Sequence, residues 1–88
     1  MVRMSKLTDY AIVLLTLLAA DESATPHNAR EVAGWAHLPF PVVSKILKAL
    51  ARAGLLVSHR GAKGGYALAR PPEEISVAEA IRAMEGPI

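Results

Sequence analysis

The first segment of the chain repeats apolar residues at intervals of three and four positions. The residues that keep this spacing are Leu7, Tyr10, Ala11, Leu14, Leu15 and Leu18. The spacing brings them onto one broad face of a helix, so it predicts a buried helix over residues 8–20. Thr8 is the expected N-cap of this helix, and Asp9 is favourable in its first turn because a negative charge stabilises that end.

A second, shorter helix is predicted over residues 29–36, after a polar loop over residues 21–27. Asn28-Ala-Arg-Glu31 has the spacing of a capping box, in which the Glu31 side chain reaches back to the amide of the cap residue. The following Leu38-Pro39-Phe40-Pro41 places two prolines two positions apart, and proline cannot continue a helix. The sequence therefore predicts a tight break between two helices.

The third predicted helix, over residues 41–53, has one apolar face and one basic face. Pro41 suits its first turn, where no N–H is needed, and Gly54 suits the position just after its end. The apolar face carries Val43, Ile46, Leu47 and Leu50. At about 100° per residue, an arc of roughly 100° on the opposite side carries Pro41, Ser44, Lys45, Lys48 and Arg52.

Beyond Gly54 the pattern becomes that of strands. Residues 55–60 and 66–69 are short strand-like runs separated by Gly61-Ala-Lys-Gly-Gly65, which predicts a β-hairpin with a glycine-rich tip. Pro71-Pro72 is expected to close this hairpin.

A fourth helix is predicted to run to Glu85. Ser76-Val-Ala-Glu79 is a second capping box that would open it, and Gly86-Pro87 would end it. Its apolar stripe, which we expect to pack into the core of the domain, is Val77, Ala80, Ile81 and Met84.

Composition limits the chain to one small domain. It has 88 residues, 52% of them hydrophobic, and no cysteine. The absence of cysteine excludes disulfides, thiolate-held iron–sulfur clusters and most structural zinc sites within these residues, and it favours a reducing compartment, the cytoplasm.

An apolar run over residues 11–20 follows Arg3 and Lys6 and has the outline of a signal peptide. Asp9, Tyr10 and Thr16 interrupt that pattern, and a run of ten falls far short of the ~20 residues that span a bilayer, so we favour a buried helix and no membrane.

The basic residues are concentrated in the middle of the chain. The formal net charge is only +2, but residues 32–72 contain six Lys and Arg residues and no Asp or Glu. The remainder contains four basic and eight acidic residues. A basic segment of this kind favours binding to a polyanion.

The order of these elements is typical of a winged helix-turn-helix domain, a mainly α fold with a small β-hairpin (α+β). A helix that enters the major groove of DNA needs an apolar back and a front of short and basic side chains, and a hairpin beside it needs a thin, positive tip. We therefore predict double-stranded DNA as the partner. The expected DNA-binding residues are Pro41, Ser44, Lys45, Lys48, Arg52, Arg60 and Lys63.

Other functions fit the sequence less well. The glycine-rich segment leads into a strand, whereas a phosphate-binding loop leads into a helix. His27, His37 and His59 share no metal-ligand spacing, and Ser58 and His59 are neighbours on a strand and point to opposite faces, so we expect no metal site, no catalytic residues and no enzyme. The alternative is a winged-helix module that binds another protein through an apolar patch of Trp35, Leu38, Phe40 and Val42.

Three segments resemble the IscR-type family of bacterial winged-helix regulators, and the match covers nearly the whole chain. They are Arg3-Met-Ser-Lys-Leu-Thr-Asp-Tyr-Ala11, Pro41-Val-Val-Ser-Lys-Ile-Leu47 and Leu55-Leu-Val-Ser-His-Arg-Gly-Ala-Lys-Gly-Gly-Tyr66. Ser76-Val-Ala-Glu-Ala-Ile81 with Glu85-Gly86 is also similar to the segment that follows the wing in that family. Within the family, the resemblance is greatest to regulators of SUF-type iron–sulfur cluster assembly operons.

The resemblance implies roles for particular residues. Arg60 would be the wing arginine that enters the minor groove, and Ser44, with Pro41 and Lys45, would face the bases. Family members often carry an acidic or amide residue where Ser44 stands. The resemblance therefore does not imply which DNA sequence (operator) this chain would recognise. His37 stands where glycine is common, which implies a residue near the left-handed conformation.

The resemblance also implies a repressor that acts as a homodimer in its full-length form. In cluster-binding members, three cysteines and a further ligand for a two-iron two-sulfur cluster follow the position of Ile88, and a long pairing helix follows them. We therefore divide the chain into a winged helix-turn-helix DNA-binding domain over residues 1–72 and a helical segment over residues 73–88 that leads toward a sensing and dimerisation segment outside it. No cofactor is expected in the 88 residues themselves.

Overall fold

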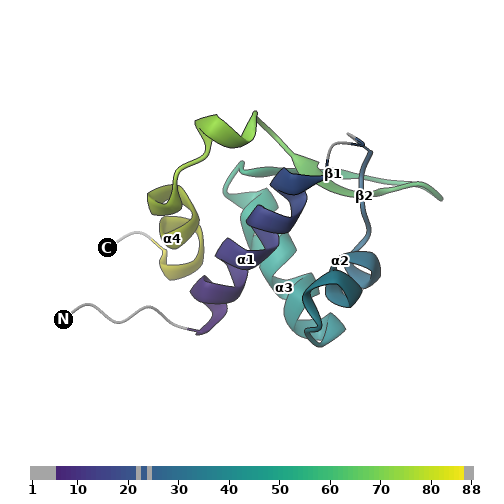
Figure 1. Ribbon diagram of the computed structural model, residues 1–88, viewed down its shortest axis with the longest axis horizontal. Coiled ribbons are helices and arrows are strands. Elements are labelled where there is room, and N and C mark those ends of the chain that lie inside the picture. Colours follow the sequence, from purple (N-terminus) through teal and green to yellow (C-terminus); the bar gives the residue numbers. More distant parts are fainter. Residues whose placement is uncertain (1–5, 22, 24, 87–88) are drawn as a thin grey trace.

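The computed structural model describes residues 6–21, 23 and 25–86. The start of the first motif, Arg3 to Ser5, and the expected helix terminator Pro87 lie outside these residues. Four α-helices, one 3-10 helix and a two-stranded antiparallel hairpin form the described fold, and its class, a winged helix-turn-helix, is confirmed (Figure 1). The elements are α1 (Lys6–Ala20), α2 (Ala29–Ala36), α3 (Phe40–Arg52), β1 (Leu56–His59), β2 (Gly65–Leu68), the 3-10 helix (Pro72–Glu74) and α4 (Val77–Glu85).

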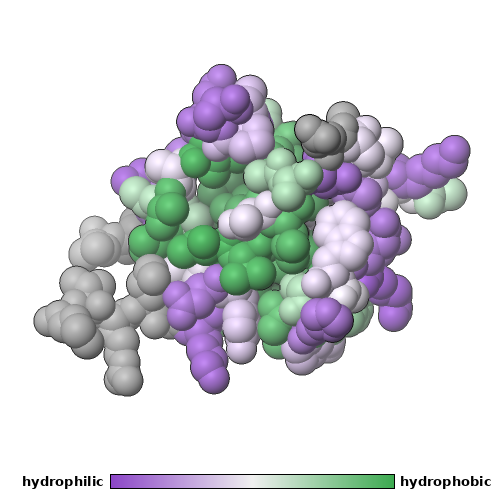
Figure 2. Space-filling view, in the orientation of Figure 1, coloured by the Kyte–Doolittle hydropathy of each residue, from purple (hydrophilic) through white to green (hydrophobic). Residues whose placement is uncertain are grey.

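The core lies where α1 packs against the other three helices. Its completely buried side chains come mainly from α1 and α3, and Val32 of α2 and Ala80 of α4 add to them. Figure 2 shows hydrophobic residues at the centre of one face and hydrophilic residues toward the hairpin end. None of the helices in the described part of the chain has the length and hydropathy needed to cross a membrane.

Helix α1 begins two residues before its predicted start, and the expected cap at Thr8 is wrong. Thr8 lies inside the helix, is completely buried, and donates a hydrogen bond from its hydroxyl to the carboxylate of Glu85 in α4. Because a buried hydroxyl requires a partner, this contact ties α1 to α4. Leu7 and Tyr10 are only partly buried at the edge of the core.

Helices α2 and α3 meet through the predicted tight break. The capping box of Asn28 and Glu31 opens α2, and His37 ends it in the left-handed conformation at φ 56° and ψ 41°. Both predictions are confirmed. Helix α3 begins at Phe40, one residue before the predicted start, since Pro39 serves as its N-cap and Pro41 still falls in its first turn.

The first strand of the hairpin is shorter than predicted, with four residues instead of six, and the second keeps four residues but begins one residue earlier, at Gly65. Leu56 pairs with Leu68 and His59 pairs with Gly65. After the hairpin, Pro72 starts a 3-10 turn that the sequence analysis missed, although proline at a first helical position is a usual start signal.

Helix α4 is opened by the predicted capping box of Ser76 and Glu79. Ala80 is completely buried, and Ala83 and Met84 pack against the core. The prediction that Val77 packs inward is wrong, because 58% of its surface is exposed. Val77 is the first residue of the helix and lies at its outer edge.

Candidate nucleic-acid interface

The orientation of α3 is fixed by its buried face. Val43, Ile46, Leu47 and Leu50 are all completely buried. Because these four side chains anchor one side of the helix, the opposite side must face outward. Pro41, Lys45, Lys48 and Arg52 are exposed there, and Ser44 is half-buried between them.

The charges on this outward face are not neutralised within the described residues. The ion pairs in that part of the chain join His27 to Asp21 and Glu31, and Arg70 to Glu79. Lys45, Lys48 and Arg52 take part in none of them, so their full charge is available to a ligand.

The hairpin tip adds two more cations. Arg60 follows β1 directly, Lys63 lies in the turn, and both are exposed without an ion-pair partner among the described residues. A backbone hydrogen bond of 2.9 Å from the N–H of Gly64 to the carbonyl of Gly61 closes the turn. The hairpin projects from the helices, and its far end is hydrophilic (Figures 1 and 2).

Arg70 does not join this group, although it belongs to the acid-free segment. Its guanidinium donates a 2.5 Å hydrogen bond to Glu79 and another to the carbonyl of Glu74. The N–H of Ser76 and the guanidinium of Arg70 together hold the pKa of the Glu79 carboxyl below its usual value. Arg70 therefore fastens the 3-10 segment to α4.

The hairpin is held against the helices by a backbone contact that the sequence analysis missed. His27, in the loop before α2, exchanges two hydrogen bonds with Tyr66 of β2, at 3.0 and 2.8 Å. Gly65 makes this approach possible, because a Cβ there would lie 2.3 Å from the carbonyl carbon of His27. The orientation of the wing relative to α2 is fixed at this point.

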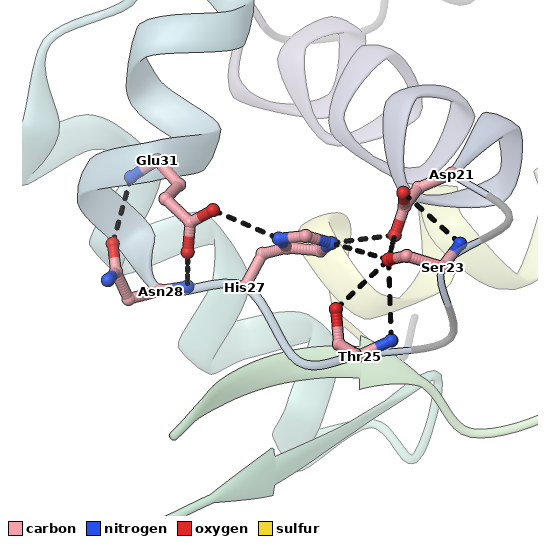
Figure 3. Close-up of polar contacts among 6 residues, drawn as sticks. All are labelled: Asp21, Ser23, Thr25, His27, Asn28 and Glu31. Atoms are coloured by element: carbon pink, nitrogen blue, oxygen red, sulfur yellow. Dashed lines mark hydrogen bonds and ion pairs between the residues drawn. The ribbon is translucent and has the colours of Figure 1, made fainter. Parts of the chain in front are cut away.

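The side chain of His27 is held by a cluster of polar groups (Figure 3). Its Nε2 lies 2.6 Å from the Asp21 carboxylate and its Nδ1 lies 3.1 Å from that of Glu31, while Trp35 packs edge-on with ring centroids 4.6 Å apart. Burial lowers the pKa of the imidazole, but the two carboxylates outweigh this effect and raise it. The pKa of Asp21 is lowered by the Ser23 hydroxyl and His27, and that of Glu31 by His27 and the Asn28 amide.

A sixth cation near α3 was also missed by the sequence analysis. Arg30, in the first turn of α2, places its guanidinium carbon over the ring of Phe40, 4.5 Å from the ring centroid. It escaped notice because it lies two residues before the acid-free segment and next to Glu31. Its position on the helix gave no signal of a contact with Phe40.

The described residues contain no group of three or more His, Cys, Asp or Glu side chains arranged to hold a metal ion. His37 and His59 are both exposed, and neither takes part in the ion pairs of the His27 cluster in the described part of the chain. Ser58 and His59 are both exposed on β1, with no acid bonded to either among the residues described.

A buried helical core that presents a basic helix beside a basic hairpin defines the class of winged helix-turn-helix proteins. Within that class, the chain belongs to the Rrf2 family, described as iron-dependent transcriptional regulators, whose profile matches residues 4–88. The resemblance to IscR-type regulators is thereby confirmed at the level of the family. The family consists of transcriptional regulators and not of enzymes.

Individual relatives agree with this assignment. The chain is 37% identical over 78 residues to the regulator IscR of Cereibacter sphaeroides, covering 86% of this chain and 50% of that protein. The structure of CymR, the global cysteine regulator of Bacillus subtilis, superposes with a TM-score of 0.90 at 32% identity, covering 100% of this chain and 68% of that one. The structure of T. potens IscR gives a TM-score of 0.85 at 34% identity, covering 97% and 62%. The chain spans about half the length of the curated relatives it matches.

Proposed function

We propose that this chain binds double-stranded DNA sequence-specifically and acts, as a homodimer in its full-length form, as a cytoplasmic transcriptional repressor. The observation that carries the proposal is the outward face of α3, where Lys45, Lys48 and Arg52 are exposed and have no carboxylate partner among the described residues. A helix with this apolar back and basic front suits the major groove.

Different residues of α3 would have different roles. Pro41, Ser44 and Lys45 lie in the first two turns, and in helix-turn-helix proteins the N-terminal part of the recognition helix contacts the base edges. Lys48 and Arg52 lie one and two turns further along the same side and would bind phosphates, which position the helix without specifying sequence.

The hairpin would bind beside the helix. Arg60 would enter the minor groove, where a guanidinium is attracted by the negative potential, and Lys63 would contact the backbone. The contact of β2 with His27 supports this role, because it holds the hairpin at a fixed orientation to the helices.

We propose iron–sulfur cluster assembly genes as the regulated targets. Support comes from the family's description as iron-dependent and from the similarity to IscR. A two-iron two-sulfur cluster does not fit these 88 residues, because they contain no cysteine. The proposed DNA binding therefore requires no cluster within these residues and rests on their basic side chains.

The test is DNA binding by single variants over a series of salt concentrations, against a duplex selected from a random-sequence pool and against an unselected duplex. Arg60→Ala is expected to weaken binding to the selected duplex by ~1–3 kcal/mol without lowering thermal stability, because an exposed wing tip contributes little to the core. Lys48→Ala should weaken binding to both duplexes alike. It should also reduce the salt slope, which is the slope of the logarithm of the binding constant against the logarithm of the salt concentration, by about 1 in magnitude.

The control is Arg82→Ala, which removes the same charge from an exposed position on α4. It should leave affinity and salt slope close to those of the unmodified chain. Binding that responds only weakly to salt would instead support an apolar protein interface and overturn the proposal.

A further inference from the structure

The contact between Arg30 and Phe40 joins the start of α2 to the start of α3. Arg30 lies in the first turn of α2, and Phe40 is the first residue of α3. The guanidinium carbon lies over the aromatic ring, 4.5 Å from its centroid. At this distance the cation is attracted to the negative face of the ring, so Phe40 restricts where the Arg30 side chain can lie.

Among the described residues, no carboxylate forms an ion pair with Arg30. Glu31, its neighbour in the chain, is held by the His27 ring and the backbone N–H of Asn28. No ion pair or hydrogen bond of Arg30 is found in the described part of the chain. A guanidinium over a ring uses its π face, so its N–H groups remain available as donors.

Phe40 also places Arg30 beside the proposed DNA-binding face. Phe40, Ser44 and Lys48 follow one another at intervals of four residues, so they form a row along α3. Phe40 is the member nearest the N-terminus of the helix, and 38% of its surface is exposed. Because Arg30 lies over Phe40, it extends this row beyond the N-terminal end of α3.

We propose that Arg30 is an additional contact to the DNA phosphate backbone and that Phe40 is the positioning residue that holds it. The inference rests on the proposed DNA binding and extends it from α3 to α2. Arginine suits this role because its planar donors match phosphate oxygens in pairs. The contact would hold the N-terminal end of α3 in its register along the groove without specifying a base.

The first test is Arg30→Ala, measured with the selected duplex and with an unselected duplex of equal length. Affinity for both should fall on the order of tenfold, because a charge-assisted hydrogen bond to phosphate is lost. The magnitude of the log–log salt slope should fall by about 0.9, the contribution of one phosphate contact. Arg82→Ala is the matched control, since it removes one exposed cation from α4, and Arg30→Lys should restore most of the salt slope.

The second test is a double-mutant cycle with Phe40→Leu, which keeps an apolar side chain and removes the ring. Phe40→Leu alone should weaken DNA binding by part of the Arg30→Ala effect. In the Arg30→Ala background it should have no further effect on affinity. Thermal melts of each variant separate a loss of fold from a loss of contact.

The outcomes are distinct. If Arg60→Ala and Lys48→Ala weaken binding but Arg30→Ala behaves like Arg82→Ala, the inference is overturned and the proposed function stands. If none of these variants weakens binding, the proposed function itself is overturned. If Phe40→Leu weakens binding equally with and without Arg30, Phe40 makes its own contact and does not hold Arg30.

Discussion

His27 connects three parts of the fold through one residue. Its backbone pairs with Tyr66 of the wing, and its ring bonds to Asp21 after α1 and to Glu31 in α2. Both ring partners are carboxylate oxygens, which only accept hydrogen bonds. A protonated imidazole, with two N–H donors, satisfies both of them. Ser23 lies 3.5 Å from Nε2, and Trp35 covers the edge of the ring.

The folding stability of the chain should therefore depend on pH through His27. The pKa of His27 is raised in the folded state, so its contribution is complete below the ordinary value of about 6.5 and is lost as pH rises through the folded value. The pKa values of Asp21 and Glu31 are lowered, so their contribution is lost as pH falls below about 4. We expect the free energy of unfolding in urea to be higher near pH 6 than near pH 8.

His27→Gln should remove most of this dependence above pH 6. His59→Gln is the control, because His59 is exposed on the hairpin and has no carboxylate partner in the described residues. A His27→Gln variant that loses as much stability between pH 6 and pH 8 as the unmodified chain would contradict the assignment.

The residues that sequence patterns located correctly are those whose role is local. Asn28 and Glu31 form their capping box within four residues. The left-handed conformation of His37 is an expectation that came from the family resemblance and not from a local pattern. Thr8 and Arg30 were misjudged or missed because their partners, Glu85 and Phe40, lie on other helices. A periodic pattern predicts which face of a helix is apolar, but it does not predict which element a single polar side chain contacts.

At the scale of elements, the glycines of the wing serve two different needs. Gly61 lies at φ 105° with open space around it, which suits a thin tip. Gly64 and Gly65 are required by close contacts, because a Cβ at Gly64 would lie 2.4 Å from the carbonyl oxygen of His59. The glycine-rich composition of the tip predicted the turn. The packing of Gly65 against His27 could not be predicted from the sequence. His27 pairs with the wing as a single residue, and one residue cannot show the apolar–polar alternation that marks a strand.

Gly65→Ala should destabilise the fold by about 1–3 kcal/mol, because a φ of +149° is strained for alanine. The added Cβ would also clash with backbone atoms of His27 and Asn28, which can move only if the loop moves with them. Gly34→Ala is the comparison, because Gly34 lies in α2 with nothing within 4 Å of an added Cβ. It should stabilise the chain by roughly 0.5–1 kcal/mol, as alanine favours the helix. The measurement is the midpoint of urea unfolding for each variant. Equal midpoints for the two would show that the wing is not held at Gly65.

At the scale of the whole molecule, the ion pairs of the described residues lie outside α3 and the hairpin tip. The carboxylates of Asp21, Glu31 and Glu79 are engaged within the fold, whereas the cations of α3 and the hairpin tip are not paired among the described residues. Charge counting along the sequence predicted this basic surface, and the helix pattern of α3 predicted its orientation. The addition of Arg30 depended on the turn between α2 and α3, which only the fold provides.

The 88-residue chain has one candidate recognition helix, α3, and this limits the affinity expected of a single copy. Specific affinity in helix-turn-helix proteins usually comes from two half-sites bound together. The large apolar side chains that remain exposed, Val13, Trp35, Phe40, Val57 and Val77, are distributed one to each of α1, α2, α3, β1 and α4. Among the described residues, no single element carries a row of exposed large apolar side chains, so we expect no strong pairing of two copies through one element.

We therefore expect the isolated 88-residue chain to sediment as a monomer at micromolar concentration and to bind a palindromic duplex weakly. Joining two copies through a flexible linker that spans both half-sites should strengthen binding by a factor on the order of 10²–10⁴, because the second copy is then held at an effective concentration of millimolar order. Sedimentation velocity with and without the duplex measures both quantities. A stable dimer of the free chain, or tight stoichiometric binding by single untethered copies, would show that these 88 residues already contain the surface that pairs two subunits.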